Sequence, residues 1–268
     1  MPKTLILNNL VFSDLPTCLQ LARFVVLTLL FFALPPFSNM EKKVVTHVIF
    51  DMDGLLLDTE TLYTEASTTV CSEYGKTYTW DIKKHLMGQK EAVSARMIID
   101  KLELPLTVEE YLTKIHMHHE RLFPNVPFLP GAEKLVRHLH SHRVPIAVVT
   151  GSATHGFELK TRKHKDFFSL FHHIVLSGDD PEVIHGKPHP DAFEVGAKRF
   201  DDTPDHAKIL VFEDAINGVT AAHAAGMPCV WVPHPRQDKS ILAEKTELII
   251  DSLEEFQPEM FGLPPYDT

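Results

Sequence analysis

The stretch that decides the fold is Asp51–Glu60, which reads DMDGLLLDTE. The run Thr46–Phe50 before it is mostly apolar or β-favouring, which predicts a short buried strand. Two carboxylates, Asp51 and Asp53, lie two residues apart at the end of this strand, so they point to the same side of the chain. Such a pair attracts a hard divalent cation and can supply both a nucleophile and an acid/base group.

The composition is that of a globular chain with an excess of acidic residues. Hydrophobic residues make up 44% of the 268 positions, enough for one large domain or two smaller ones. Lys and Arg number 26 against 36 Asp and Glu, a formal net charge of −10, which disfavours nucleic acid and anionic membranes as partners. A small phosphorylated substrate stays compatible, because a local pocket can be positive. Three scattered cysteines favour a reducing compartment without a disulfide framework.

Residues 1–39 differ from the rest of the chain. The run Phe24–Leu34 is apolar except for Thr28, but it is shorter than the roughly 20 residues that span a bilayer. A signal peptide would carry an unusually long leader here. Three interpretations stay open, namely an extension without function, a weak anchor and a signal peptide, and Met40 is a plausible start of the working protein. We expect a cytoplasmic monomer that does not associate with membranes.

Residues 61–127 have the pattern of a small helical unit. Apolar residues at helical spacing predict three helices, over Thr61–Glu73, Trp80–Leu86 and Glu91–Leu102. Thr107 followed by Glu110 is typical of a capping box, which predicts a fourth helix to about Arg121. This unit is therefore expected as an insertion directly after the first strand.

From residue 128 onward, strands alternate with helices. Five further apolar runs predict strands over Val144–Thr150, His173–Leu176, Ile209–Phe212, Cys229–Val232 and Leu248–Ile250. Runs unbroken by polar residues fit a parallel sheet that is buried on both faces, and the alternation indicates a doubly wound α/β architecture. We predict a catalytic core domain over residues 40–60 and 128–268, with residues 61–127 as a helical cap domain.

Polar side chains follow four of the predicted strands, either at the strand end or in the next loop. They are Asp51 and Asp53, Thr150 to Ser152, Lys187, and Glu213 with Asp214. Ligands of open α/β sheets lie outside the carboxyl ends of the strands, so we expect these groups to converge on one crevice. The set supports phosphoryl transfer, because Mg²⁺ held by Asp51 and Asp214 would offset the repulsion between a phosphate dianion and a carboxylate nucleophile. Lys187 would add a positive charge beside the phosphoryl oxygens.

The remaining groups have expected roles in the same reaction. The Thr150 hydroxyl and the backbone N–H groups of Gly151 and Ser152 would donate hydrogen bonds to the phosphoryl oxygens. Asp51 would attack phosphorus. Asp53 would protonate the leaving oxygen and then deprotonate the water that hydrolyses the aspartyl-phosphate.

This arrangement resembles the haloacid dehalogenase-like superfamily, whose four motifs are matched in chain order. The matching residues are Asp51–Gly54, Thr150, Lys187 and Glu213–Asp214. The resemblance implies Mg²⁺ bound by the Asp51 carboxylate, the Asp53 backbone carbonyl and Asp214. Glu213 would lie close to that ion. It also implies that the helical unit is a cap that closes over the site.

The resemblance extends over nearly all of Val45–Asp267. Stretches that carry it include SGDDPEV at 177–183, GKPHPDAF at 186–193, LVFEDAINGV at 210–219 and FGLPPY at 261–266. It implies a phosphatase of a small phosphorylated nucleoside or sugar, with pseudouridine 5′-phosphate as the implied substrate. The specificity loop would contain Gly88, Gln89 and Lys90, of which the last two could hydrogen-bond a sugar or a base.

Other functions stay open. Within enzymes, the alternatives are a broad-specificity sugar-phosphate phosphatase and a phosphosugar mutase. The related β-phosphoglucomutases carry a His on the first cap helix where this chain has Tyr63, which counts against a mutase. A dehalogenase is disfavoured because that chemistry has no use for Asp53. A non-catalytic binding relative is the alternative from another class, and the presence of all four motifs argues against it.

Overall fold

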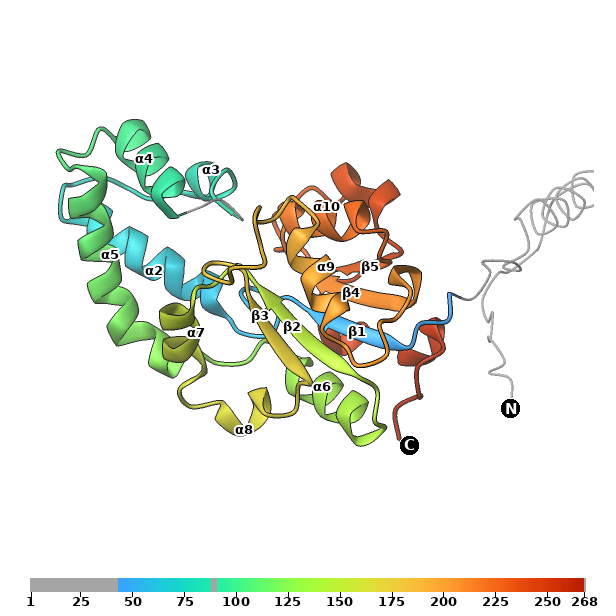
Figure 1. Ribbon diagram of the computed structural model, residues 1–268. Coiled ribbons are helices and arrows are strands. Elements are labelled where there is room, and N and C mark those ends of the chain that lie inside the picture. The colour runs from blue at the N-terminus through green and yellow to red at the C-terminus, as the bar shows by residue number, and fades with distance from the viewer. Residues whose placement is uncertain (1–42, 88–90, 268) are drawn as a thin grey trace, which may run out of the picture. The chain divides into compact units, whose positions relative to one another are not determined.

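The computed structural model describes residues 43–87 and 91–267. In this part of the chain, six parallel strands form one sheet in the order β3-β2-β1-β4-β5-β6 (Figure 1). The strands are β1 His47–Phe50, β2 Ile146–Thr150, β3 His173–Leu176, β4 Ile209–Glu213, β5 Cys229–Trp231 and β6 Leu248–Ile249. The predicted α/β fold is confirmed, and the ends of its strands shift by at most two residues.

The helices of the described residues fall into two groups. The first group follows β1 and consists of α2 Thr59–Ser72, α3 Trp80–Lys83, α4 Glu91–Leu102 and α5 Val108–Leu122. The second group alternates with the strands and consists of α6 Ala132–Ser141, α7 Thr154–Thr161, α8 Lys165–Phe168, α9 Asp191–Lys198 and α10 Ile216–Ala224. Short 3₁₀ helices lie at Phe123–Asn125, His206–Lys208, Lys239–Lys245, Leu253–Glu255 and Pro258–Phe261.

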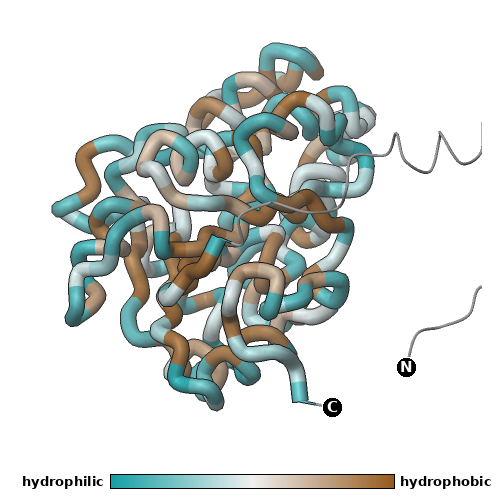
Figure 2. Tube along the Cα trace, turned by 90° about the vertical axis from the view of Figure 1, so that its right-hand side faces the viewer, coloured by the Kyte–Doolittle hydropathy of each residue, from teal (hydrophilic) through white to brown (hydrophobic). Residues whose placement is uncertain are grey.

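The sheet is covered on both faces, because successive side chains of a strand point to opposite sides. In β1, Val48 and Phe50 pack in one apolar cluster with residues of α6 and α8. Ile49 packs in a second cluster with residues of α9 and α10. All three side chains are fully buried, and Figure 2 shows hydrophobic segments gathered inside and hydrophilic ones outside. Burial on both faces explains why these strands lack the polar alternation of a half-exposed sheet.

The helical unit α2–α5 has an apolar core of its own. Ala66 and Val70 of α2 pack there with Ile98 of α4 and Ile115 of α5. The capping box predicted for α5 is confirmed, since the Glu110 N–H donates to Thr107 Oγ1 at 3.2 Å and the Thr107 N–H donates to Glu110 Oε2 at 2.8 Å.

Two helix boundaries in the helical unit differ from the predictions by two residues or more. Helix α2 begins two residues earlier, because the Asp58 side chain accepts the Thr61 N–H at 3.3 Å and caps the helix. Helix α3 ends at Lys83 rather than Leu86. The N–H groups of His85 and Leu86 donate three residues back, as in a turn, to the carbonyls of Ile82 and Lys83.

Several predictions concern residues that the structure does not describe. The apolar run Phe24–Leu34 and the loop residues Gly88, Gln89 and Lys90 lie outside the described part of the chain. Among the described helices, none combines the length and the hydrophobicity that crossing a membrane requires. Cys71 and Cys229 are both buried and free.

Candidate active site

The end of β1 carries Asp51 into the middle of the sheet edge. The Asp51 N–H donates to the Phe212 carbonyl at 3.0 Å, which continues the pairing with β4 past the end of the strand. Asp51 is 7% exposed. The chain then turns at Gly54, where φ is +80° and a Cβ would lie 2.4 Å from Asp214 Oδ2. Only glycine fits this turn, because it accepts positive φ and leaves room for the carboxylate.

Lys187 joins two carboxylates from neighbouring strand ends. Its Nζ donates to Asp51 Oδ1 at 2.7 Å, to Glu213 Oε1 at 2.6 Å and to the Val149 carbonyl at 2.9 Å. Burial by itself would lower the pKa of Lys187, but the charges of Asp51 and Glu213 raise it above its usual value. Lys187 is therefore a fixed positive charge at the centre of the site.

Glu213 and Asp214 at the end of β4 are also held in place. Glu213 is 1% exposed, and its Oε2 accepts the N–H groups of Asp214 at 3.1 Å and Ala215 at 3.2 Å. The indole of Trp231 donates to the Asp214 carbonyl at 2.7 Å. These contacts fix the backbone at the point where Asp214 enters the site.

Asp51, Glu213 and Asp214 form a buried acidic cluster whose ligand atoms lie within 4.8 Å of one another. Burial, assisted by the charges of Glu213 and Asp53, raises the pKa of Asp51 to about 7 against the lowering effect of Lys187. Burial and the neighbouring carboxylates also raise the pKa of Asp214. Lys187 pairs with two of these three carboxylates. When all four groups are ionised, their net charge is −2, from three negative charges and one positive charge. Buried carboxylate oxygens with this charge fit a hard divalent cation.

Asp53 has a different set of partners from Asp51. Its Oδ1 forms an ion pair with Lys160 Nζ at 2.6 Å. Its Oδ2 accepts the hydroxyls of Ser152 at 2.9 Å and Thr150 at 3.2 Å. Burial alone would raise the pKa of Asp53, but the Lys160 charge and the hydrogen bonds hold it below its usual value.

The predicted phosphate-binding segment lies beside Asp53. The Thr150 side chain is fully buried, and its Oγ1 accepts the Ser152 N–H at 3.2 Å. This N–H, which was expected to face a phosphoryl oxygen, is thus engaged within the segment. Gly151 is exposed, and a Cβ there would meet nothing within 4 Å, so the space beside it is open.

Lys160 is a site residue that the sequence analysis missed. It lies on α7, is 2% exposed, and donates to Ser152 Oγ and to Tyr63 Oη, both at 2.9 Å. The sequence offers no signal that Lys160 is buried, because most lysines lie at the surface. Only the tertiary position of Asp53 shows why this one is buried.

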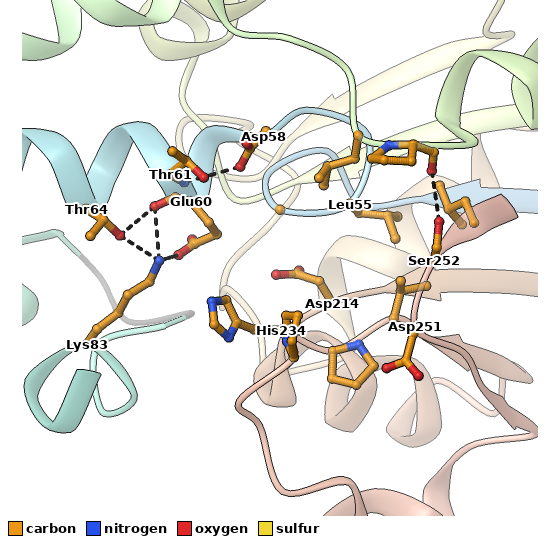
Figure 3. A pocket seen from close by; sticks show the side chains of 17 residues that line it. Leu55, Asp58, Glu60, Thr61, Thr64, Lys83, Asp214, His234, Asp251 and Ser252 are labelled. Atoms are coloured by element: carbon orange, nitrogen blue, oxygen red, sulfur yellow. Dashed lines mark hydrogen bonds and ion pairs between the residues drawn. The ribbon is translucent and has the colours of Figure 1, made fainter. Parts of the chain in front are cut away.

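A pocket of about 500 Å³ leads from Asp214 to the helical unit. Figure 3 places Lys83 and Glu60 opposite Asp214 and His234. Lys83 Nζ lies 3.0 Å from Glu60 Oε2 and donates to Thr64 Oγ1 at 2.7 Å. The pocket gives a small molecule room next to the acidic cluster.

Known proteins share the sequence pattern of this site. Residues 48–232 match the sequence model of a protein family, which is described as haloacid dehalogenase-like hydrolase. A Drosophila melanogaster protein named "Probable pseudouridine-5'-phosphatase" is 46% identical over 229 residues, which are 85% of this chain and 99% of the relative. An Arabidopsis thaliana protein named "(DL)-glycerol-3-phosphatase 2" is 46% identical over 226 residues, which are 83% of this chain and 93% of the relative.

A solved structure shares the fold. The crystal structure of "putative beta-phosphoglucomutase from Thermotoga maritima" matches with a TM-score of 0.64 and 29% sequence identity. The match covers 81% of this chain and 97% of that chain. The similarity therefore includes both the sheet and the helical unit.

Proposed function

This chain belongs to the haloacid dehalogenase-like hydrolase family and is a phosphoric monoester hydrolase, and we propose that it is a Mg²⁺-dependent phosphatase acting through an aspartyl-phosphate. The observation that carries the proposal is the buried contact of Lys187 with Asp51 and Glu213, next to Asp214. A buried nucleophile beside a fixed positive charge is what attack on a phosphate dianion requires.

Four side chains would perform the two half-reactions. An Asp51 oxygen forms a bond to phosphorus while the ester bond breaks. Asp53, whose pKa is lowered in the free site, must first take up a proton, which it then gives to the leaving oxygen. A water oxygen then attacks the same phosphorus and gives its proton to Asp53, which releases inorganic phosphate and restores Asp51. Lys187 offsets the repulsion between nucleophile and phosphate throughout. The Thr150 hydroxyl would turn from Asp53 to a phosphoryl oxygen, beside the Gly151 and Ser152 backbone.

The acidic cluster is the proposed magnesium site. Asp51, Asp214 and the Asp53 backbone carbonyl would hold the ion, and Glu213 would support them through Lys187 and the backbone. When bound, Mg²⁺ supplies positive charge that stabilises the phosphoryl group during transfer. The donors are all oxygens, as Mg²⁺ prefers.

The proposed substrate is pseudouridine 5′-phosphate, bound under helices α2–α5 acting as the cap. The similarity to the Drosophila relative, which covers 85% of this chain and 99% of the relative, supports this choice. Glycerol 3-phosphate is the second candidate, because the Arabidopsis relative is equally similar. Tyr63 stands where β-phosphoglucomutases carry a His, and its hydroxyl is engaged by Lys160, so a mutase is disfavoured.

A substrate comparison tests this proposal. Full-length protein with Mg²⁺ should release phosphate from pseudouridine 5′-phosphate with a higher kcat/KM than from glycerol 3-phosphate, UMP or hexose phosphates. A higher value for glycerol 3-phosphate would select the second candidate. Equal values for UMP and pseudouridine 5′-phosphate would remove the assignment of pseudouridine as the preferred nucleoside. Full activity in the presence of a chelator would contradict the proposed magnesium site.

A further inference from the structure

We infer that Lys160 is a positioning residue for Asp53, and that Tyr63 connects Lys160 to the cap. The inference rests on the proposed function, because it concerns the group that exchanges protons with the leaving oxygen and with water. It assigns a role to a buried charge that the four family motifs do not include.

The ammonium group of Lys160 contacts one charged partner, the carboxylate of Asp53. Its Nζ lies 2.6 Å from Asp53 Oδ1 and donates to two hydroxyls, those of Ser152 and Tyr63. The aromatic rings of Tyr63 and Phe123 lie 5.2 and 5.1 Å from it. A buried ammonium is tolerated only when it is paired and hydrogen-bonded, so the positions of Lys160 and Asp53 depend on each other.

The contacts of Asp53 fix the orientation of its carboxyl group. Oδ1 is paired with Lys160, while Oδ2 accepts the hydroxyls of Thr150 and Ser152. A carboxyl group held from these directions has little freedom to rotate. Proton transfer requires an oxygen within hydrogen-bond reach of the reacting atom, so this restraint bears directly on the rate.

Tyr63 extends the contact into the cap. It lies on α2, and its ring packs edge-on against His119 at 5.1 Å and Phe123 at 5.2 Å. Its hydroxyl accepts a hydrogen bond from Lys160, which belongs to core helix α7. The path from Asp53 through Lys160 to Tyr63 therefore joins the proton-transfer group to the element that would cover the substrate.

The test compares two esters that differ in their need for an acid. Nitrophenolate leaves p-nitrophenyl phosphate without a proton, whereas an alkyl oxygen needs one from Asp53. With Lys160→Met, we expect kcat for pseudouridine 5′-phosphate or glycerol 3-phosphate, whichever the wild type hydrolyses, to fall roughly 10²-fold. The first-turnover release of nitrophenolate should keep its wild-type rate, followed by slower turnover, because water activation also uses Asp53.

Two further variants distinguish the proposed role of Lys160 from a folding defect in Lys160→Met. Tyr63→Phe removes one hydroxyl and keeps the ring, and we expect the same selective loss for the alkyl ester, roughly tenfold. Lys163→Met is the control, because Lys163 is an exposed lysine in the turn two residues after the same helix. It should match the wild type with both esters.

Two results would overturn the inference alone. One is a Lys160→Met variant that loses the first-turnover rate with p-nitrophenyl phosphate as strongly as the alkyl rate. The other is wild-type activity of Lys160→Met and Tyr63→Phe with both esters. Failure of the proposed function looks different, because the wild type itself would then turn over neither ester, and both proposals would fall together.

Discussion

Glycine at two positions lets the carboxylates of the site approach the backbone. At Gly218 of α10, a Cβ would lie 1.8 Å from Cδ of Glu213, and at Gly54 it would lie 2.4 Å from Asp214 Oδ2. Glu213 has no room to retreat, because Lys187 and two backbone N–H groups hold it. These contacts make a single added methyl group a direct probe of the site.

Gly218→Ala is expected to displace Glu213 and weaken its pairing with Lys187. The overpacking should reduce the free energy of unfolding by roughly 1–3 kcal/mol, and kcat should fall roughly 10²-fold because the Lys187 charge moves. Urea unfolding and phosphatase assays measure both effects.

Gly156→Ala is the matched control for this change. Gly156 is also the third residue of its helix, α7, but a Cβ there would meet nothing within 4 Å. Alanine should therefore stabilise the helix by about 0.5–1 kcal/mol with unchanged activity. Equal behaviour of the two variants would refute the packing argument at Gly218.

The structure of the site residues could be predicted only in part. The sequence indicates that Asp51, Lys187 and Asp214 meet at one edge, because parallel strands align their carboxyl ends. It does not indicate that the Thr150 hydroxyl contacts Asp53, or that Lys160 is buried beside it. Side-chain orientation and the burial of one charge depend on tertiary contacts, which no local pattern contains.

At the scale of elements, helix α5 carries a buried histidine in the cap. The His119 ring stacks on Phe123 at 4.2 Å, and burial, assisted by the Lys160 charge, lowers the pKa of His119 to about 3. Between about pH 3 and the unfolded value of 6.5, the unfolded chain binds a proton that the folded chain does not. The free energy of unfolding therefore falls by about 1.4 kcal/mol for each pH unit below 6.5.

His119→Phe should remove this contribution to the pH dependence. Between pH 6.5 and pH 5, we expect the wild type to lose about 2 kcal/mol more stability than the variant. Urea unfolding at the two pH values measures the difference. An identical slope for His119→Phe and the wild type would contradict the argument.

The elements themselves were largely predictable from local signals. The capping box of Thr107 and Glu110 marks the start of α5, and β-branched runs mark the strands. The end of α3 was not predictable, because Leu86 continues the apolar spacing while the backbone leaves the helix at Lys83. Tertiary packing overrides local preference most easily in such short helices.

At the scale of the whole described molecule, the helical unit α2–α5 contacts the rest of the fold through an aromatic pair as well as through Tyr63. Trp80 of α3 stacks on His234, which follows β5, with ring centroids 4.4 Å apart and planes at 22°. Both residues are partly exposed. The pair lies far apart in the sequence, so only the fold reveals it, and its His234 member lines the pocket next to Asp214.

Trp80→Ala should loosen the cap without altering the catalytic groups. An aromatic pair contributes about 0.5–1.5 kcal/mol, so hydrogen exchange of the α3 amides should accelerate roughly two- to tenfold, while Trp80→Phe should retain most of the protection. Unchanged exchange in Trp80→Ala would show that the stack does not hold the cap. Lys84→Ala, at an exposed position after the same helix, is the control.

The most direct test of the central claim is the identification of the phosphorylated residue during turnover. Full-length protein mixed with a radiolabelled phosphate monoester and Mg²⁺, then quenched in acid, should carry hydroxylamine-sensitive label on the peptide that contains Asp51. Asp51→Asn should carry no label and show no turnover, because an amide oxygen is a poor nucleophile. Label on a different residue, or turnover that persists in Asp51→Asn, would contradict the account.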